Sequence, residues 1–123
     1  MEFTLQLLLG FVAAICLSGG LNLLIKGSSS FLPDSVPPQK TLDNLFRFLS
    51  GIYIGMGILL IWVVFNIQEQ NTILYFLGLI VLFSGLGRLY STLKVGLGGT
   101  YLTFVMLLEI VLGISIMTLQ YFR

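Results

Sequence analysis

The chain has 123 residues, of which 6 are Lys or Arg and 5 are Asp or Glu. Charged residues make up 9% of the chain, against roughly a quarter in an ordinary soluble domain, and hydrophobic residues make up 57%. Eleven charges cannot cover a water-facing surface or form a basic face for nucleic acid. The composition therefore excludes a soluble globular protein, a disordered chain and a nucleic-acid binder, and it predicts an integral membrane protein.

The sequence has no His and a single Cys, Cys16. Without His there is no imidazole to act as a general base, a metal ligand or a haem ligand, and one Cys cannot form an internal disulfide. Cys16 lies in an apolar run and is interpreted as a small apolar packing residue. We therefore expect no metal, no cofactor and no enzymatic activity.

Residues 3–25 carry no charge and are long enough to cross about 30 Å of hydrocarbon as a helix. A secretory signal peptide would begin with basic residues and end at a small-residue cleavage site. Here Glu2 precedes the apolar run and no such site follows it, so we expect a retained first span. The segment 26–41, which contains three consecutive serines and three prolines, is predicted to be a loop.

Three further spans are predicted, over residues 42–67, 72–93 and 101–119. Thr41 is expected to be the N-cap of the second helix, and the short polar turn before the third implies an antiparallel neighbour. In lipid, only helices and closed barrels satisfy their own backbone hydrogen bonds, and apolar runs of this length exclude a barrel. The predicted fold is all-α, a four-transmembrane-helix bundle with short loops that forms one domain over 1–123.

Basic residues are concentrated on one side of this topology. Loops 26–41 and 94–100 lie on the same side as five of the six basic residues, whereas the opposite side, with both termini, carries only Arg123. The five are Lys26, Lys40, Arg47, Arg88 and Lys94. The positive-inside rule then predicts that both loops are cytoplasmic and both termini outside.

Three charges are predicted to lie inside the spans, namely Arg47, Arg88 and Glu109. Glu109 is eight residues into the fourth span, so roughly 12 Å from its end. An unpaired carboxylate at that depth costs on the order of 2.5–3.5 kcal/mol. Because both arginines lie in the same half of the membrane, we expect one or both to meet Glu109. Tyr53 and Asn22 are expected to be further polar members of this cluster.

Each of these charges has a glycine three or four residues away on its own helix. Small residues let membrane helices approach closely, so these glycines are predicted to lie at helix contacts. The predicted packing residues are Gly51, Gly55, Gly85 and Gly113.

A short similarity also links the first and third spans, where Ser18-Gly19 matches Ser84-Gly85. It hints at a repeat of two hairpins. The second and fourth spans give no convincing alignment, so the repeat remains a hint.

The cluster allows more than one function. An ion-pair network can fix helix packing in a non-enzymatic protein that associates with itself or serves as an accessory subunit of a larger membrane complex. Alternatively, two arginines against one glutamate leave a positive surplus that suits a phosphate, a carboxylate or an anionic lipid head group, in a binding protein or a transporter. A third interpretation has Glu109 exchange protons during transport. The expected partners are the lipid bilayer, an anionic lipid and other membrane chains.

The residues also resemble a known family. The motifs Arg47-x-x-x-Gly51-x-Tyr53-x-x-x-Gly57 and Gly85-x-Gly87-Arg88-x-x-Ser91, followed by Gly96 and Glu109, resemble domain-of-unknown-function family 4345. The resemblance spans nearly the whole chain. It implies a small four-span protein of the bacterial inner membrane with no assigned activity, and it agrees with the choice of the two arginines and the glutamate as candidate site residues.

Overall fold

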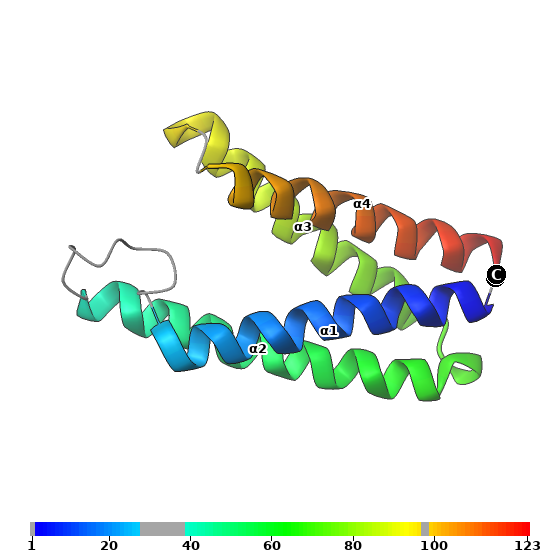
Figure 1. Cartoon of the computed structure of the whole chain (residues 1–123). Helices are drawn as coiled ribbons and strands as arrows, with labels where there is room; N and C mark the ends of the chain where they lie inside the picture. The colour runs from blue at the N-terminus through cyan, green and yellow to red at the C-terminus, as the bar shows by residue number, and fades with distance from the viewer. Residues whose placement is uncertain (1, 28–38, 97–98) are drawn as a thin grey trace. The chain divides into compact units, whose positions relative to one another are not determined.

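The computed structural model describes residues 2–27, 39–96 and 99–123. These ranges contain four α-helices and no strand: α1 (Glu2–Lys26), α2 (Lys40–Phe65), α3 (Thr72–Val95) and α4 (Thr100–Phe122), with the 3-10 helix η2 (Ile67–Glu69) between α2 and α3 (Figure 1). Each α-helix is long and apolar enough to cross a membrane. The predicted all-α architecture of four spanning helices is therefore confirmed.

The helix bounds differ slightly from the predicted spans. The amide of Asp43 donates to the carbonyl of Gln39 at 2.8 Å, so α2 begins at Lys40 and Thr41 lies in its first turn rather than at the N-cap. The helix ends at Phe65, two residues early, because η2 follows. The serines and prolines of the predicted loop 26–41, at 28–38, and residues 97–98 of the loop 94–100 lie outside the described residues.

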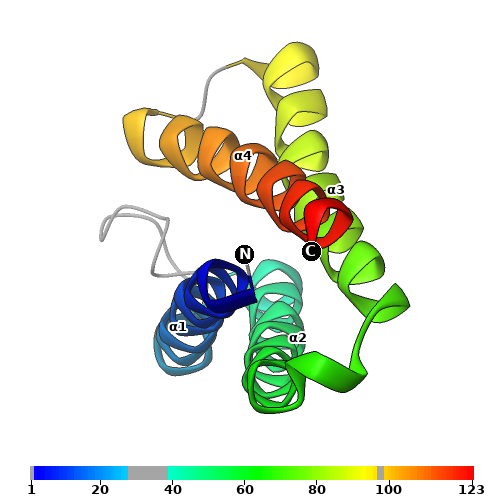
Figure 2. The same cartoon turned by 90° about the vertical axis from the view of Figure 1, so that its right-hand side faces the viewer.

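The chain divides into two compact units, one formed by residues 9–65 and the other by residues 1–8 with 66–123. The first unit contains an antiparallel hairpin of α1, from Leu9 onward, and α2 (Figures 1 and 2). We call this the first hairpin. In the other unit, α3 and α4 form the second hairpin.

In the first hairpin the two helices touch at glycines. A Cβ atom built on Gly20 of α1 would lie 3.1 Å from the carbonyl oxygen of Ser50 in α2. A Cβ atom on Gly57 of α2 would lie 2.6 Å from Cγ of Leu17 in α1. A side chain at Gly20 would press on the backbone of α2, whereas one at Gly57 would displace the side chain of Leu17. Small residues at these positions let the two helices approach closely.

The second hairpin is closed in the same way. A Cβ atom on Gly85 of α3 would lie 3.1 Å from the carbonyl oxygen of Met106 in α4. A Cβ atom on Gly113 of α4 would lie 2.6 Å from the amide nitrogen of Leu82 and 2.8 Å from the carbonyl oxygen of Gly78. Because the neighbours of Gly113 are backbone atoms, they cannot move aside as a flexible side chain would.

We expect Gly113→Leu to destabilise the second hairpin, because the new side chain can fit only if α3 and α4 separate. Overpacking of this kind costs about 1–3 kcal/mol or more. The measurement is the midpoint of SDS-induced unfolding in mixed micelles, followed by circular dichroism. Gly87→Leu in α3 is the matched control, because a Cβ atom at Gly87 has no atom of the described residues within 4 Å outside its own stretch of helix. Equal midpoints for the two variants would contradict the close contact at Gly113.

Candidate functional site

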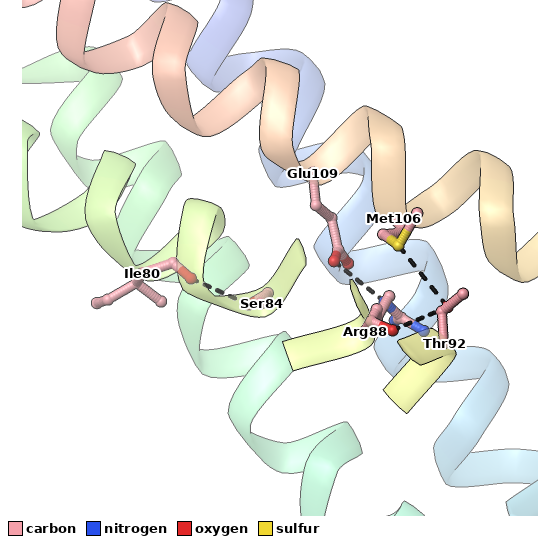
Figure 3. Close-up of polar contacts among 6 residues, drawn as sticks. All are labelled: Ile80, Ser84, Arg88, Thr92, Met106 and Glu109. Atoms are coloured by element: carbon pink, nitrogen blue, oxygen red, sulfur yellow. Dashed lines mark hydrogen bonds and ion pairs between the residues drawn. The ribbon is translucent and has the colours of Figure 1, made fainter. Parts of the chain in front are cut away.

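An ion pair crosses between the two helices of the second hairpin. Nε of Arg88 in α3 donates a hydrogen bond to Oε2 of Glu109 in α4 at 3.0 Å (Figure 3). The Arg88 side chain is 34% exposed and that of Glu109 is 17% exposed. A charge-assisted hydrogen bond of this kind is stronger than a neutral one, and here it provides the partner that a carboxylate inside an apolar helix requires.

The hydroxyl groups near the pair bond mainly to the backbone of their own helix (Figure 3). Oγ1 of Thr92 donates to the carbonyl oxygen of Arg88 at 3.1 Å, and Oγ of Ser84 donates to that of Ile80 at 3.0 Å. Thr92 Oγ1 also lies 3.9 Å from Sδ of Met106 in α4. Bonds to the preceding turn satisfy a hydroxyl where lipid provides no partner. In this group, the ion pair is therefore the main polar link from α3 to α4.

Arg47 lies in the first hairpin and contacts the end of α1. Its Nε donates to Oδ2 of Asp43 at 2.9 Å, and its Nη1 donates to the carbonyl oxygen of Leu24 at 2.8 Å. The Leu24 carbonyl is one of the last four of α1, which have no partner within their helix. Gly27 follows with φ of +60°, where a Cβ atom would overlap the Asp43 carboxylate. Arg47 therefore caps α1 and ties it to the start of α2.

Two other residues of the predicted cluster also lie in the first hairpin. Asn22 is exposed on α1, and Tyr53 is half-buried on α2. Of the five predicted members, the structure thus brings Arg88 and Glu109 together directly, and it gives Arg47 partners within its own hairpin.

The four glycines predicted to pack divide into two groups. Gly85 and Gly113 lie at the contact of the second hairpin, whereas a Cβ atom on Gly51 or Gly55 would have no other atom of the described residues within 4 Å. The contact face of α2 runs through Gly57 instead. At about 100° per residue, Gly51 and Gly55 point well away from that face.

Sequence reasoning missed the role of Arg123, at the end of α4. Its Nη1 donates to the carbonyl oxygen of Ile67 at 2.8 Å, and its Nη2 donates to that of Gln70 at 2.6 Å and to Oδ1 of Asn71 at 2.7 Å. The planar guanidinium thus joins the end of α4 to the turn before α3. These partners are 52 to 56 residues away in the chain, so no local pattern indicates them.

We expect the substitutions Arg123→Met and Arg47→Met each to loosen a different hairpin. Each removes a guanidinium but keeps a long apolar stem, and hydrogen bonds to a charged group contribute about 1.5–3 kcal/mol at most, less where solvent reaches them. Hydrogen exchange of backbone amides should become faster around residues 67–71 in the first variant and at the end of α1 in the second. Each variant serves as the control for the other, and an identical exchange pattern in both would contradict these local roles.

Comparison with known proteins gives one match. The sequence model of the family described as "Domain of unknown function (DUF4345)" matches residues 4–120, which include most of α1 and α4 and all of α2 and α3. No curated protein and no solved structure matches the chain. With a match of this extent, and with four helices able to span a membrane, the chain belongs to the DUF4345 family.

Proposed function

We propose that this chain is a non-enzymatic membrane protein that acts by association, with further copies of itself or as an accessory subunit of a larger membrane complex. The observation that carries this proposal is how its polar groups are used. Arg47 and Arg123 bind carbonyl groups at helix ends and turns of the same chain, and Ser84 and Thr92 bond to the preceding turn of α3. The helices are left with apolar outer surfaces, which suit lipid or another membrane helix.

Outward-facing apolar side chains occur on every helix. Between 22% and 28% of the residues in the most apolar window of each helix are buried. Large exposed side chains include Phe11 on α1, Ile58 on α2, Phe83 on α3 and Phe104 on α4. An apolar surface binds another helix only where that helix can come close, so small residues on it indicate where a partner helix could bind.

Gly51 and Gly55 form a glycine-x-x-x-glycine pattern on the face of α2 that points away from the contact with α1, where a Cβ atom at either would meet no atom outside its own stretch of helix within 4 Å among the described residues. In membranes this spacing lets two helices pack backbone to backbone. It supports a contact between α2 and the α2 of a second copy of the chain.

The orientation proposed for the chain rests on charge. Five of the six basic residues lie near the end of α1, the start of α2 or the end of α3. This supports placing these helix ends on the cytoplasmic side of the membrane. The same rule supports both chain ends lying outside, and the bacterial inner membrane is proposed from the family resemblance alone.

We expect the wild-type protein to form an oligomer or to co-purify with a partner. The double substitution Gly51→Leu and Gly55→Leu should lower the mass of the protein in detergent, because leucines at both positions hold a second helix away. Light scattering of the protein–detergent complex measures this mass, and Gly87→Leu is the control. A strictly monomeric wild-type protein without a partner would contradict the proposal.

A second candidate function uses the Arg88–Glu109 pair, in a transporter or in a protein that binds an anion or a lipid head group. The pair is partly exposed and lies within apolar helices, where a phosphate or carboxylate can compete with Glu109 for the guanidinium. Replacement of Glu109 by an anion at the Arg88 guanidinium is how a ligand would bind here, and this supports the alternative function.

If the chain transports protons with Glu109, Glu109→Gln should abolish proton flux, because an amide cannot take up or release a proton at neutral pH. Flux is followed with a pH-sensitive dye in vesicles that contain the purified protein. The exposed Glu69 of η2 provides the matched control, Glu69→Gln, which should leave flux unchanged. Unchanged flux in Glu109→Gln would reject a proton-transport role.

A further inference from the structure

The two hairpins are closed by equivalent glycine contacts. A Cβ atom on Gly20 would lie 2.8 Å from Cγ1 of Ile54 and 3.1 Å from its amide nitrogen. A Cβ atom on Gly85 would lie 2.6 Å from Cγ1 of Ile110 and 3.0 Å from its amide nitrogen. In each case the first helix of a hairpin presents a glycine to the same two atoms of an isoleucine in the second helix.

A second contact lies at a corresponding position in each hairpin. Here the glycine belongs to the second helix and faces the first helix. A Cβ atom on Gly57 would lie 3.4 Å from the carbonyl oxygen of Ala13, and one on Gly113 would lie 2.8 Å from that of Gly78. In the first hairpin the atoms closest to this glycine are side-chain atoms of Leu17, and in the second they are backbone atoms of Leu82; each leucine lies four residues further along the first helix. The contact at Gly113 is therefore the closer of the two. The same faces of the two helices therefore meet, in the same register, in both hairpins.

These contacts define a residue-by-residue alignment. It pairs α1 with α3 at a spacing of 65 positions, as between Gly20 and Gly85, and α2 with α4 at a spacing of 56, as between Gly57 and Gly113. The alignment based on Ser18 and Ser84 is thus one residue out of register. In the corrected register, residues 9–24 match 74–89 at seven identical positions: Leu9, Phe11, Ile15, Leu17, Gly20, Leu21 and Leu24.

The second and fourth helices, which give no convincing alignment by sequence alone, also match in this register. The identical positions in α2 are Phe48, Ile54, Gly57 and Ile58, which correspond to Phe104, Ile110, Gly113 and Ile114 in α4. Burial follows the same alignment at two pairs of positions. Leu60 and its counterpart Ile116 are both 0% exposed, as are Leu9 and Leu74.

The ion pair does not follow this repeat. The counterparts of Arg88 and Glu109 in the first hairpin are Leu23 and Tyr53. The first hairpin makes glycine contacts at the corresponding positions without charges at Leu23 and Tyr53, and its own charged link, from Arg47 to the Leu24 carbonyl, lies at the end of α1 instead. We infer that the chain is a tandem of two copies of one helical hairpin, and that the Arg88–Glu109 pair is a site specific to the second copy which its helix packing does not require.

This inference does not depend on the association proposed above. It assigns the pair to a task other than packing, and the groups present are a guanidinium, which binds oxyanions, and a carboxylate, which binds cations or a proton. It also predicts which side chains can replace the pair without loss of the hairpin, namely those found at the equivalent positions of the first copy.

The first experiment transfers the first-hairpin residues to the second, in the double variant Arg88→Leu with Glu109→Tyr. The midpoint of SDS-induced unfolding should stay at the wild-type value, whereas Gly85→Leu should lower it strongly. The single variant Arg88→Leu, which leaves Glu109 without its arginine, should also lower it. If the double variant unfolds as early as Gly85→Leu, the pair is part of the packing and the inference is overturned.

The second experiment makes the reverse transfer, Leu23→Arg with Tyr53→Glu, and keeps the inference testable if the first variant fails to fold. Each single variant should lower the midpoint, and the double variant should recover part of the loss because the two new groups lie where Arg88 and Glu109 lie in the second hairpin. The control is Leu23→Arg with Ile52→Glu, since position 52 faces about 100° away from position 53. Equal recovery in both combinations, or recovery in neither, would contradict the equivalence of the hairpins.

Discussion

Inside a bilayer, apolar side chains gain little by leaving lipid for one another, so two helices stay together through close van der Waals contact. In both hairpins of this chain that contact is made at glycines, where the backbone of one helix lies against backbone or side-chain atoms of its neighbour. Gly20 and Gly57 provide it in the first hairpin, and Gly85 and Gly113 provide it in the second. These contacts set the rotation of each helix about its axis. That rotation in turn decides which polar side chains meet and which face outward.

The charges of the chain serve two different purposes. Arg47 and Arg123 bind carbonyl groups at the end of α1 and in the turn before α3, where the backbone has acceptors without helical partners. The Arg88–Glu109 pair instead links two helices along their length, away from the helix ends. The end contacts complete the secondary structure. The pair adds two charged groups to helices that are otherwise largely apolar.

Comparison of the two hairpins distinguishes the glycine contacts, which both have, from the ion pair, which is found in the second hairpin. Both hairpins make glycine contacts at corresponding positions, and the positions of the charged pair are occupied by Leu23 and Tyr53 in the first hairpin. Membership of the DUF4345 family describes this helical scaffold over residues 4–120 and attaches no activity to it. A function for this protein must therefore be sought in what the scaffold carries. The pair on the second hairpin and the open glycines on α2 are the two features that the packing itself leaves unexplained.

The sequence by itself determined the four helices, because an apolar run of about 20 residues in lipid must form its backbone hydrogen bonds locally. It also determined that Glu109 needs a partner, since a lone carboxylate at that depth is too costly. Only the tertiary structure decided that Arg88 meets it and that Arg47 caps α1. It also decided that α2 packs through Gly57 rather than Gly51 or Gly55. The physical reason is that these helices are apolar on all sides, so no single helix indicates which face its neighbour will take.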